Sequence, residues 1–373
     1  MDSAELTAWL MLQAVEGVGD HTVLRLLQIW GSPGAVLAAS RTDLIHNGCS
    51  AELAERIKQD PDTRTRRQIE RQISVAERLK IQVLTILDQG YPERLKAIAD
   101  PPPLLYVSGT LEKADEVAVA IVGGRRATAG GRLITEEIAR DLTSYGITVL
   151  SGLARGIDAA AHRGALAGNG RTIAVLGCGI DRTYPPEHDK LRRTIEAQGA
   201  VISELPIGAP PQSHHFPRRN RILSGMSMGV LVTEAAVKSG SLITATLALE
   251  QGRDVFAVPG SVKEEACRGS NGLIKEGAKL VECAQDILEE LAPQLDARAR
   301  ARLSIGNAVR SSEPTSLGAE EALIYQALSY EPQSIDTVIA STQMTAAAVT
   351  STLLSLELNG RVRQLPGQQY IRI

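Results

Sequence analysis

Arginines and glycines occur together in short turns between residues 123 and 158, and this combination is typical of anion-binding sites. Residues 123–126 read GGRR, and residues 151–158 read SGLARGID. Each turn follows a short apolar run rich in β-branched residues, which predicts a strand of a parallel sheet buried on both faces. A helical pattern follows each turn, and a helix N-terminus offers backbone N–H groups and the positive end of its dipole. The chemistry predicted for these turns is therefore the binding of phosphate.

Three later segments carry the same residue types. They are 177–185 (GCGIDRTYP), 216–221 (FPRRNR) and 238–244 (KSGSLIT), which we interpret as further turns at strand ends. Parallel strands joined by right-handed crossovers bring such turns to one edge of a sheet, where α/β proteins bind ligands. The alternative is that the glycines only shape the turns and the arginines only face solvent. Because five such turns converge on one edge, a phosphate site explains them better than this alternative does. The candidate phosphate-binding residues are Gly123, Gly124, Arg125, Arg126, Ser151, Gly152, Arg155, Gly156, Asp158, Phe216, Arg218, Asn220, Arg221, Lys238, Ser239 and Gly240.

The acidic residues and histidines near these turns are expected to have supporting roles. Asp158 and Glu234 are expected to orient arginines or backbone donors rather than to act as acids. His162 lies one turn into its helix, a position more typical of packing or capping than of a base. The pair of histidines at 214–215 has no metal-ligand partners at useful spacing. No catalytic residue, metal or cofactor is predicted.

The elements that must position these turns alternate regularly between strand and helix, which predicts an α/β fold with a doubly wound, mostly parallel sheet. Strands are expected near 83–87, 104–107, 117–122, 147–150, 172–176, 201–203, 230–233, 255–258 and 279–281. After residue 117, helices are expected from near 132 and over 187–197, 218–226, 242–251, 272–276 and 283–291.

Other binding and catalytic motifs are missing or misplaced. No G-x-G-x-x-G follows the strand at 117–122, and no P-loop is present, which argues against dinucleotide and nucleoside triphosphate sites. Residues 225–229 (GMSMG) match G-x-S-x-G, but they lie between a helical pattern and a strand. A nucleophile elbow needs the reverse order, strand then serine then helix, so the motif is rejected.

The two flanks predict smaller domains. Residues 1–75 form a helical domain in which a GVG turn at 17–19 separates two helices. This arrangement resembles a helix-hairpin-helix, whose turn can hold a DNA phosphate, or it is a plain tight turn of a SAM-like helical domain. Residues 76–293 form the α/β domain, 294–318 a linker, and 319–373 a winged helix of three helices and a hairpin. The expected recognition helix of this winged helix, 345–358, contains no lysine or arginine. This composition favours packing against protein over binding in the major groove of DNA.

Composition limits the function classes. The chain has 373 residues, 43% hydrophobic and 22% charged, with a net charge of −3, so a nucleic-acid site must be a local patch. Aromatic residues make up only 3%, which disfavours an extensive base-stacking platform. The four cysteines are far apart and no long apolar run is present, so no disulfide framework, zinc site or membrane segment is expected. We expect a cytoplasmic protein.

Several motifs resemble the DNA-processing protein A (DprA/Smf) family in order and spacing. They are VAIVGGRR, SGLARGIDAAAH, GCGID…YP, SELP, FPRRNRI, SGSLITA, VPG and GSNGLIKEGA, covering about 91–290, with a looser match to LLSLELNGRV. The resemblance implies an extended Rossmann-like domain that binds single-stranded DNA as a homodimer, protects it and loads the RecA recombinase onto it during natural transformation. It implies no established catalytic reaction. Two departures are Gly124, where the family usually has serine, and His188, where asparagine is common.

An enzyme is the alternative from a different class. Related Rossmann-like phosphoribohydrolases bind and cleave nucleoside monophosphates with a PGGxGTxxE turn and a catalytic glutamate. Here residues 234–242 read EAAVKSGSL, and Pro259 and Gly260 precede Ser261 and Val262 rather than that motif.

The dimer is expected on an apolar surface near the far end of the sheet. A helix at the end of a doubly wound sheet exposes one face to water. Residues 241–249 and the pair Leu273 and Ile274 are apolar and provide little polar surface for such a face, so a partner is expected to cover them. Burial of these residues by the helix at 283–291 is the alternative, and the family resemblance favours the dimer.

Overall fold

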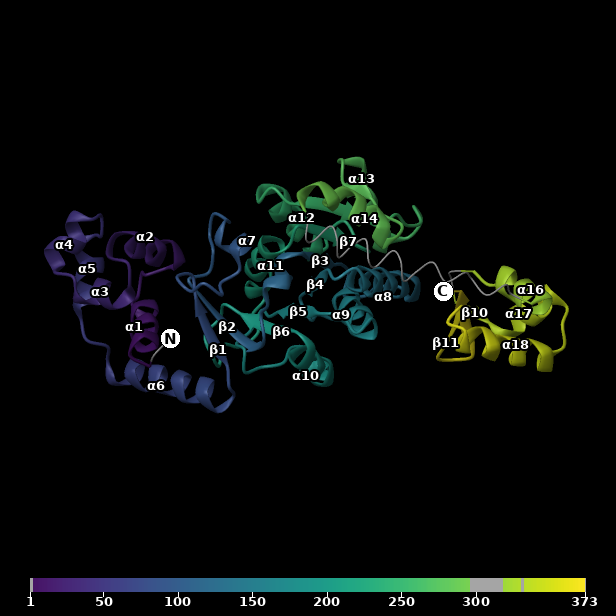
Figure 1. Ribbon diagram of the computed structural model, residues 1–373, viewed down its shortest axis with the longest axis horizontal. Helices are drawn as coiled ribbons and strands as arrows, with labels where there is room; N and C mark the ends of the chain where they lie inside the picture. Colours follow the sequence, from purple (N-terminus) through teal and green to yellow (C-terminus); the bar gives the residue numbers. More distant parts are fainter. Residues whose placement is uncertain (1–2, 296–317, 330–331, 373) are drawn as a thin grey trace.

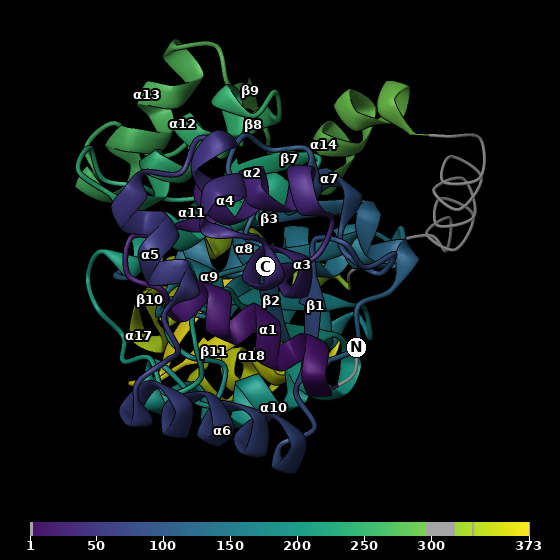
Figure 2. The same ribbon diagram turned by 90° about the vertical axis from the view of Figure 1, so that its left-hand side faces the viewer.

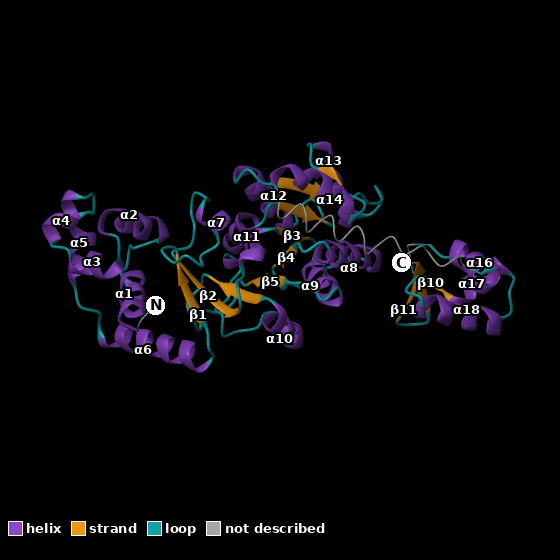
Figure 3. Cartoon of the chain, viewed as in Figure 1, coloured by secondary structure: helices purple, strands orange, loops and turns teal. Residues whose placement is uncertain are grey.

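The computed structural model describes residues 3–295, 318–329 and 332–372. A nine-stranded sheet occupies the middle of the described chain, with a helical domain before it and a small module after it (Figure 1). Figure 3 shows that residues 3–81 contain helices but no strands. The predicted α/β class, with a helical domain and a winged helix on either side, is confirmed.

The N-terminal domain packs its helices around a small apolar core that includes Trp9, Leu12 and Leu26. Serine or aspartate side chains cap four of the helices by accepting a backbone N–H three residues ahead, as Asp62 does for α6. The helices are α1 (Ser3–Ala14), α2 (Asp20–Trp30), α3 (Pro33–Ala38), α4 (Arg41–His46), α5 (Ala51–Lys58) and α6 (Thr63–Arg78). Because α6 continues to Arg78, the predicted domain boundary at residue 75 falls inside a helix.

The sheet has the order β1-β2-β6-β5-β4-β3-β7-β8-β9. Strands β3 to β9 pair in parallel, whereas β2 runs antiparallel to both β1 and β6. The strands are β1 (Gln82–Thr85), β2 (Leu104–Gly109), β3 (Ala118–Val122), β4 (Thr148–Ser151), β5 (Thr172–Val175), β6 (Ala200–Ser203), β7 (Gly229–Val232), β8 (Asp254–Ala257) and β9 (Lys279–Leu280). Strand β3 is the topological switch point, because the chain proceeds from it to β4 on one side and reaches β7 on the other.

Helices cover both faces of the sheet, as the apolar strands require. Val119 and Ile121 of β3 lie in one core cluster with residues of α8, α9 and α14, while Ala118 and Ala120 lie in another cluster with residues of α11 and α12. The helical elements of this part are α7 (Glu93–Lys96), η1 (Lys113–Glu116), α8 (Ala129–Ser144), α9 (Ile157–Ala167), η2 (Pro186–His188), α10 (Asp189–Gln198), α11 (His215–Met226), α12 (Gly240–Glu250), η3 (Glu265–Cys267), α13 (Arg268–Lys275), α14 (Ala284–Leu291) and η4 (Ala292–Gln294).

One predicted turn is part of a helix. Residues 216–221 lie within α11, which begins at His215, so this segment is not a turn at a strand end. Pro217 is compatible with the helix because it is in the first turn, where its missing N–H would have no intrahelical partner.

The C-terminal module has three helices and a three-stranded sheet of order β10-β12-β11, as a winged helix requires. Its elements are α16 (Ala319–Ala327), β10 (Gln333–Ser334), α17 (Ile335–Thr342), α18 (Ala346–Leu358), β11 (Val362–Leu365) and β12 (Gln369–Arg372). Arg363 of β11 forms a 2.7 Å ion pair with Glu136 of α8. Most of the predicted linker at 294–318 lies outside the described residues.

Candidate functional site

A cavity of about 360 Å³ lies beside the carboxyl ends of β3 and β4 and the first turns of α11 and α12. Four segments far apart in sequence line it, as parallel strand order predicts. Seven of the sixteen candidate residues are among its lining residues: Gly123, Arg125, Asp158, Phe216, Asn220, Ser239 and Gly240. The structure therefore brings together the core of the predicted site.

The first two glycine turns pack directly on each other. Ile157 donates its N–H to the carbonyl of Gly124, and a side chain at Gly156 would overlap that same carbonyl. Gly156 also has a φ of +77°, which favours glycine. On the other side, Gly124 donates its N–H to the carbonyl of Glu234 at 2.6 Å. These contacts fix the backbone from which Arg125 projects.

Arg125 is exposed and lies over an aromatic ring. Its guanidinium carbon is 5.3 Å from the centroid of the Phe216 ring, and the Tyr184 ring is 5.5 Å from Phe216. Phe216 is half-buried, so the arginine and part of the ring face outward together. A guanidinium beside an aromatic face can bind a phosphate and an adjoining base at the same time.

The N-terminus of α12 forms another part of the cavity. Ser239 caps the helix, Gly240 is exposed at its first position, and Lys238 is exposed just before it. The hydroxyl of Thr244 in the same helix is buried, lines the cavity and has no hydrogen-bond partner in the part of the chain that the structure describes. This end of the cavity offers an anion backbone N–H groups, a positive dipole end and a hydroxyl.

Arg219 is a cavity residue that was missing from the sequence prediction. It is only 4% exposed, and it donates hydrogen bonds to the carbonyls of Gly152, at 3.0 Å, and Val175. Gly152 directly follows β4, and Val175 is the last residue of β5. Arg219 therefore fills the space between the ends of these two strands. A side chain at Gly152 would overlap the guanidinium. The three arginines of residues 216–221 indicated that this segment belongs to the site. Which of them points inward depends on the orientation of helix α11, which the sequence does not give.

Asp158 has the supporting role that was predicted. It is buried and accepts hydrogen bonds from the backbone N–H groups of Gly152 and Ala154. Burial raises the pKa of its carboxyl, an effect that the nearby Arg219 opposes. Glu234 likewise accepts from the N–H and the hydroxyl of Thr128 at 2.9 and 2.6 Å.

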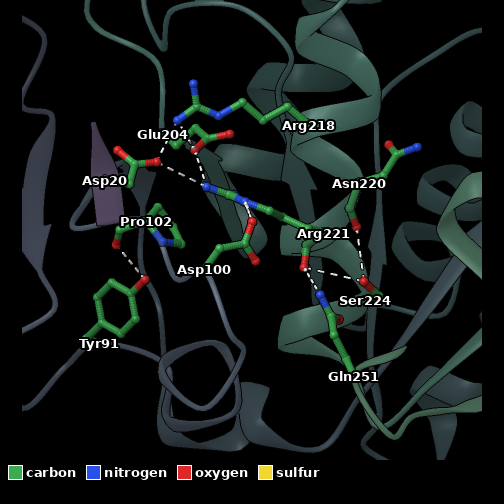
Figure 4. A network of polar contacts seen from close by, with 10 residues as sticks. All are labelled: Asp20, Tyr91, Asp100, Pro102, Glu204, Arg218, Asn220, Arg221, Ser224 and Gln251. Carbon is green, nitrogen blue, oxygen red and sulfur yellow. Dashed lines mark hydrogen bonds and ion pairs between the residues drawn. The ribbon is translucent and has the colours of Figure 1, made fainter. Parts of the chain in front are cut away.

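Arg218 and Arg221, two further candidates for phosphate contact, lie in an ion-pair network and not among the residues that line the cavity (Figure 4). Arg221 is 5% exposed and pairs with Glu204 at 2.7 Å and Asp100 at 2.9 Å. Arg218 is half-exposed and pairs with Asp20 at 2.6 Å and with Glu204 at 3.3 Å. Their charges are already matched by carboxylates, and Asp20 belongs to the N-terminal domain. This network joins two domains instead of lining the cavity.

Ser151 is also absent from the residues that line the cavity. Its side chain is fully buried and its hydroxyl donates to the carbonyl of Ile121 at 2.6 Å, so it holds β4 against β3. Arg155 is exposed but pairs with Glu187, and neither it nor Arg126 lines the cavity. Gly124 has room for a side chain, since an added Cβ would meet only the carbonyl of Glu234 at 3.5 Å. A serine would therefore fit there.

His162 and His188 have structural roles. Desolvation lowers the pKa of His162 to about 3, so its ring is neutral, and Nδ1 lies 2.7 Å from the Thr172 hydroxyl. His188 is buried with Nδ1 2.9 Å from the carbonyl of Leu153. Among the described residues, no group of three or more histidine, cysteine or acidic side chains could hold a metal ion, and no helix could span a membrane.

A larger cleft of about 910 Å³ lies at the N-terminus of α8, beside residues of the C-terminal module. Five carboxylates line it against one arginine, Arg372: Glu137, Asp141, Glu234, Glu264 and Glu282. This sign of charge repels phosphate, so we assign the candidate site to the smaller cavity.

Comparisons with known proteins agree with this architecture. Residues 82–292 match the family model described as DNA recombination-mediator protein A, and residues 308–368 match the DprA winged helix domain. The Protein Smf of Escherichia coli is 35% identical over 369 residues, covering 98% of this chain and 95% of that protein.

Two solved structures are also similar. The DprA structure from Streptococcus pneumoniae has a TM-score of 0.67 at 36% identity and covers 78% of this chain and 99% of its own. A structure of DNA processing protein A from Helicobacter pylori, described for its single-stranded DNA binding mode, has a TM-score of 0.52 at 30% identity, covering 58% and 98%. The strand-end cavity, the winged helix and these matches together show that the chain belongs to the DNA recombination-mediator protein A (DprA/Smf) family.

Proposed function

We propose that the cavity binds single-stranded DNA. Arg125, Lys238 and the N-terminus of α12 contact the phosphates, and Phe216 stacks on a base. The observation that carries this proposal is the convergence of an exposed arginine, a half-buried aromatic ring and a helix N-terminus on one cavity. The similar Helicobacter pylori protein is described as binding single-stranded DNA, which supports it.

Arg125→Ala tests the proposal. We expect weaker binding of an oligonucleotide and a plot of log K against log salt that is flatter by about 0.7 for each phosphate that the variant no longer neutralises. Fluorescence anisotropy over a series of salt concentrations measures both. Arg163→Ala is the control, since Arg163 is exposed on α9 and does not line the cavity. A wild-type slope for Arg125→Ala would show that this arginine does not contact the strand.

The proposed activity is binding without a reaction. Nucleotide hydrolysis at this edge would need a free carboxylate or base, but Asp158 caps backbone donors and both oxygens of Glu234 accept from Thr128. Comparing the affinity for an oligonucleotide with that for AMP, while assaying release of free base, separates the two classes. Tighter binding of AMP, or its cleavage, would favour the enzyme.

We further propose that the bound strand is protected and handed to the RecA recombinase during natural transformation. The description of the family as a DNA recombination mediator supports this step, and a cavity that binds the backbone of the strand would leave its other side accessible to a second protein. RecA filament formation on single-stranded DNA should be accelerated by the wild-type protein and not by Arg125→Ala.

A homodimer is the proposed assembly, built on the apolar surface around α12. Ile243 and Leu249 of this helix are 44% and 63% exposed, and Val237 and Val262 of adjoining loops are also exposed. Helix α14 does not cover them, because it packs with α8 and Phe256 in the other core cluster. An exposed apolar face of this kind fits a symmetric contact between two copies.

Charge substitutions test the dimer. Leu249→Lys together with Ile243→Lys should give a folded monomer, because neither side chain is buried in the core and a lysine there would oppose its own copy. Sedimentation at micromolar concentration measures the mass. Leu358→Lys is the control, since Leu358 is 81% exposed on α18. A wild-type monomer under these conditions would overturn the proposed interface.

A further inference from the structure

Helix α6 of the N-terminal domain carries a row of arginines that the cavity does not use. The helix contains five arginines and two glutamates. All five arginines are exposed, and four of them, Arg64, Arg67, Arg71 and Arg78, share one side of the helix. We call these four residues the α6 stripe.

The spacing of the α6 stripe places all four side chains on one side of the helix. At 100° per residue they fall within a sector of about 60°. The stripe extends for about 21 Å along the axis, since each residue adds about 1.5 Å. Glu70, Glu77 and Arg66 lie outside this sector.

The opposite side of α6 is fixed against the rest of the protein. Ile69, Gln72 and Ala76 are buried, and the hydroxyl of Tyr106 in β2 donates to Gln72 at 3.4 Å. The α6 stripe is therefore turned outward, and Figures 1 and 2 both show α6 along the lower outer edge of the N-terminal domain. Because the apolar side is already covered, α6 has no face to insert into a membrane.

No carboxylate forms an ion pair with the α6 stripe within the described part of the chain. Of the five α6 arginines, only Arg66 forms an ion pair there, with Asp60 at 3.3 Å. Elsewhere exposed arginines of this domain do find acidic partners, as Arg41 does with Glu55 and Arg56 with Glu16.

Two charges of the α6 stripe repel each other. Arg67 and Arg71 are four residues apart, so their like charges lie on neighbouring positions of the helix surface. The N-cap Asp62 complements the helix dipole and lies near Arg64, but it forms no ion pair with Arg67 or Arg71 in the described part of the chain. The repulsion between Arg67 and Arg71 is relieved when a polyanion lies along the stripe.

We propose that the α6 stripe is a second binding surface for the backbone of single-stranded DNA, separate from the strand-end cavity. The inference rests on the proposed binding of single strands by this protein. Arginine forms bidentate contacts with phosphate, and a row of four such groups without base-reading side chains contacts the backbone irrespective of sequence. Two linked surfaces on one strand raise its overall affinity only when the strand is long enough to reach both.

The experiment compares short and long oligonucleotides bound to the full-length protein. In the quadruple variant Arg64→Gln, Arg67→Gln, Arg71→Gln and Arg78→Gln, binding of a strand of about ten nucleotides should equal that of the wild type. Binding of a strand of about sixty nucleotides should be at least about tenfold weaker, since linked sites raise avidity by about a hundredfold or more. The salt slope for the long strand should fall by about 0.7 for each phosphate released.

A charge-matched control removes four positive charges from the same domain outside the stripe: Arg41→Gln, Arg56→Gln, Lys58→Gln and Arg66→Gln. It should bind the long strand as the wild type does. Equal weakening by this control, or wild-type binding of the long strand by the stripe variant, would overturn the inference. Should the quadruple variant fail to fold by circular dichroism, Arg71→Gln alone gives the same comparison with a smaller effect.

Arg125→Ala separates this inference from the proposed function. If Arg125→Ala weakens both strand lengths and the stripe variant weakens neither, the cavity binds DNA and the α6 stripe does not. If only the stripe variant weakens long-strand binding, the stripe binds DNA and the cavity does not.

Discussion

Arginines close together in sequence have different environments in this protein. Within residues 216–221, Arg219 lies under the cavity, Arg218 is half-exposed in ion pairs, and Arg221 is buried among carboxylates. The sequence predicted a cationic segment, but it could not assign these roles. The partners Asp20, Asp100 and Glu204 come from distant parts of the chain and meet only after the domains have packed.

Arg221→Met should therefore reduce stability rather than DNA binding. It leaves Glu204 buried without its closest partner, and breaking a buried ion pair costs about 3–5 kcal/mol. Urea unfolding should show a lower transition midpoint, and the folded variant should bind an oligonucleotide as the wild type does. Arg126→Met is the control, because Arg126 is exposed and should change the midpoint little. Loss of binding with unchanged stability would restore Arg221 as a phosphate contact.

At the scale of elements, alternating apolar strands and helical patterns were enough to predict the sheet and the edge at which its turns meet. The periodicity could not reveal that β2 lies antiparallel between β1 and β6, because pairing is decided by contacts between strands. It also could not show that 216–221 begins α11. The first helical turn leaves its N–H groups free, and proline there looks the same in sequence as proline in a loop.

The contact between the first two turns gives a prediction about glycine. Gly156→Ala forces a side chain into the left-handed region and against the carbonyl of Gly124, which should cost about 2 kcal/mol or more. Gly240→Ala meets no atom within 4 Å and lies in the first turn of α12, so stability should be unchanged or slightly higher. Thermal unfolding of both variants measures the contrast. Equal stabilities would mean that the two turns do not pack as described.

The whole molecule has a net charge of −3, yet it has two separate surfaces that are locally basic. The exposed arginines and lysine around the cavity form one, and the α6 stripe forms the other. Asp20 links the N-terminal domain to α11 through Arg218 and Arg221, so the domain carrying the stripe is held against the domain carrying the cavity (Figure 4). Overall composition could predict a local patch, but not that there are two.

Photocrosslinking of a short single strand shows most directly whether DNA binds at the strand-end cavity. An oligonucleotide of about six nucleotides that carries a photoreactive thymine is too short to depend on avidity between separate sites. After irradiation, mass spectrometry of the digested protein identifies the attached peptides. Attachment is expected at the peptides that contain Arg125, Phe216 and Lys238. Attachment only to peptides outside 122–126, 213–223 and 238–244 would contradict the assignment of the cavity as the DNA-binding site.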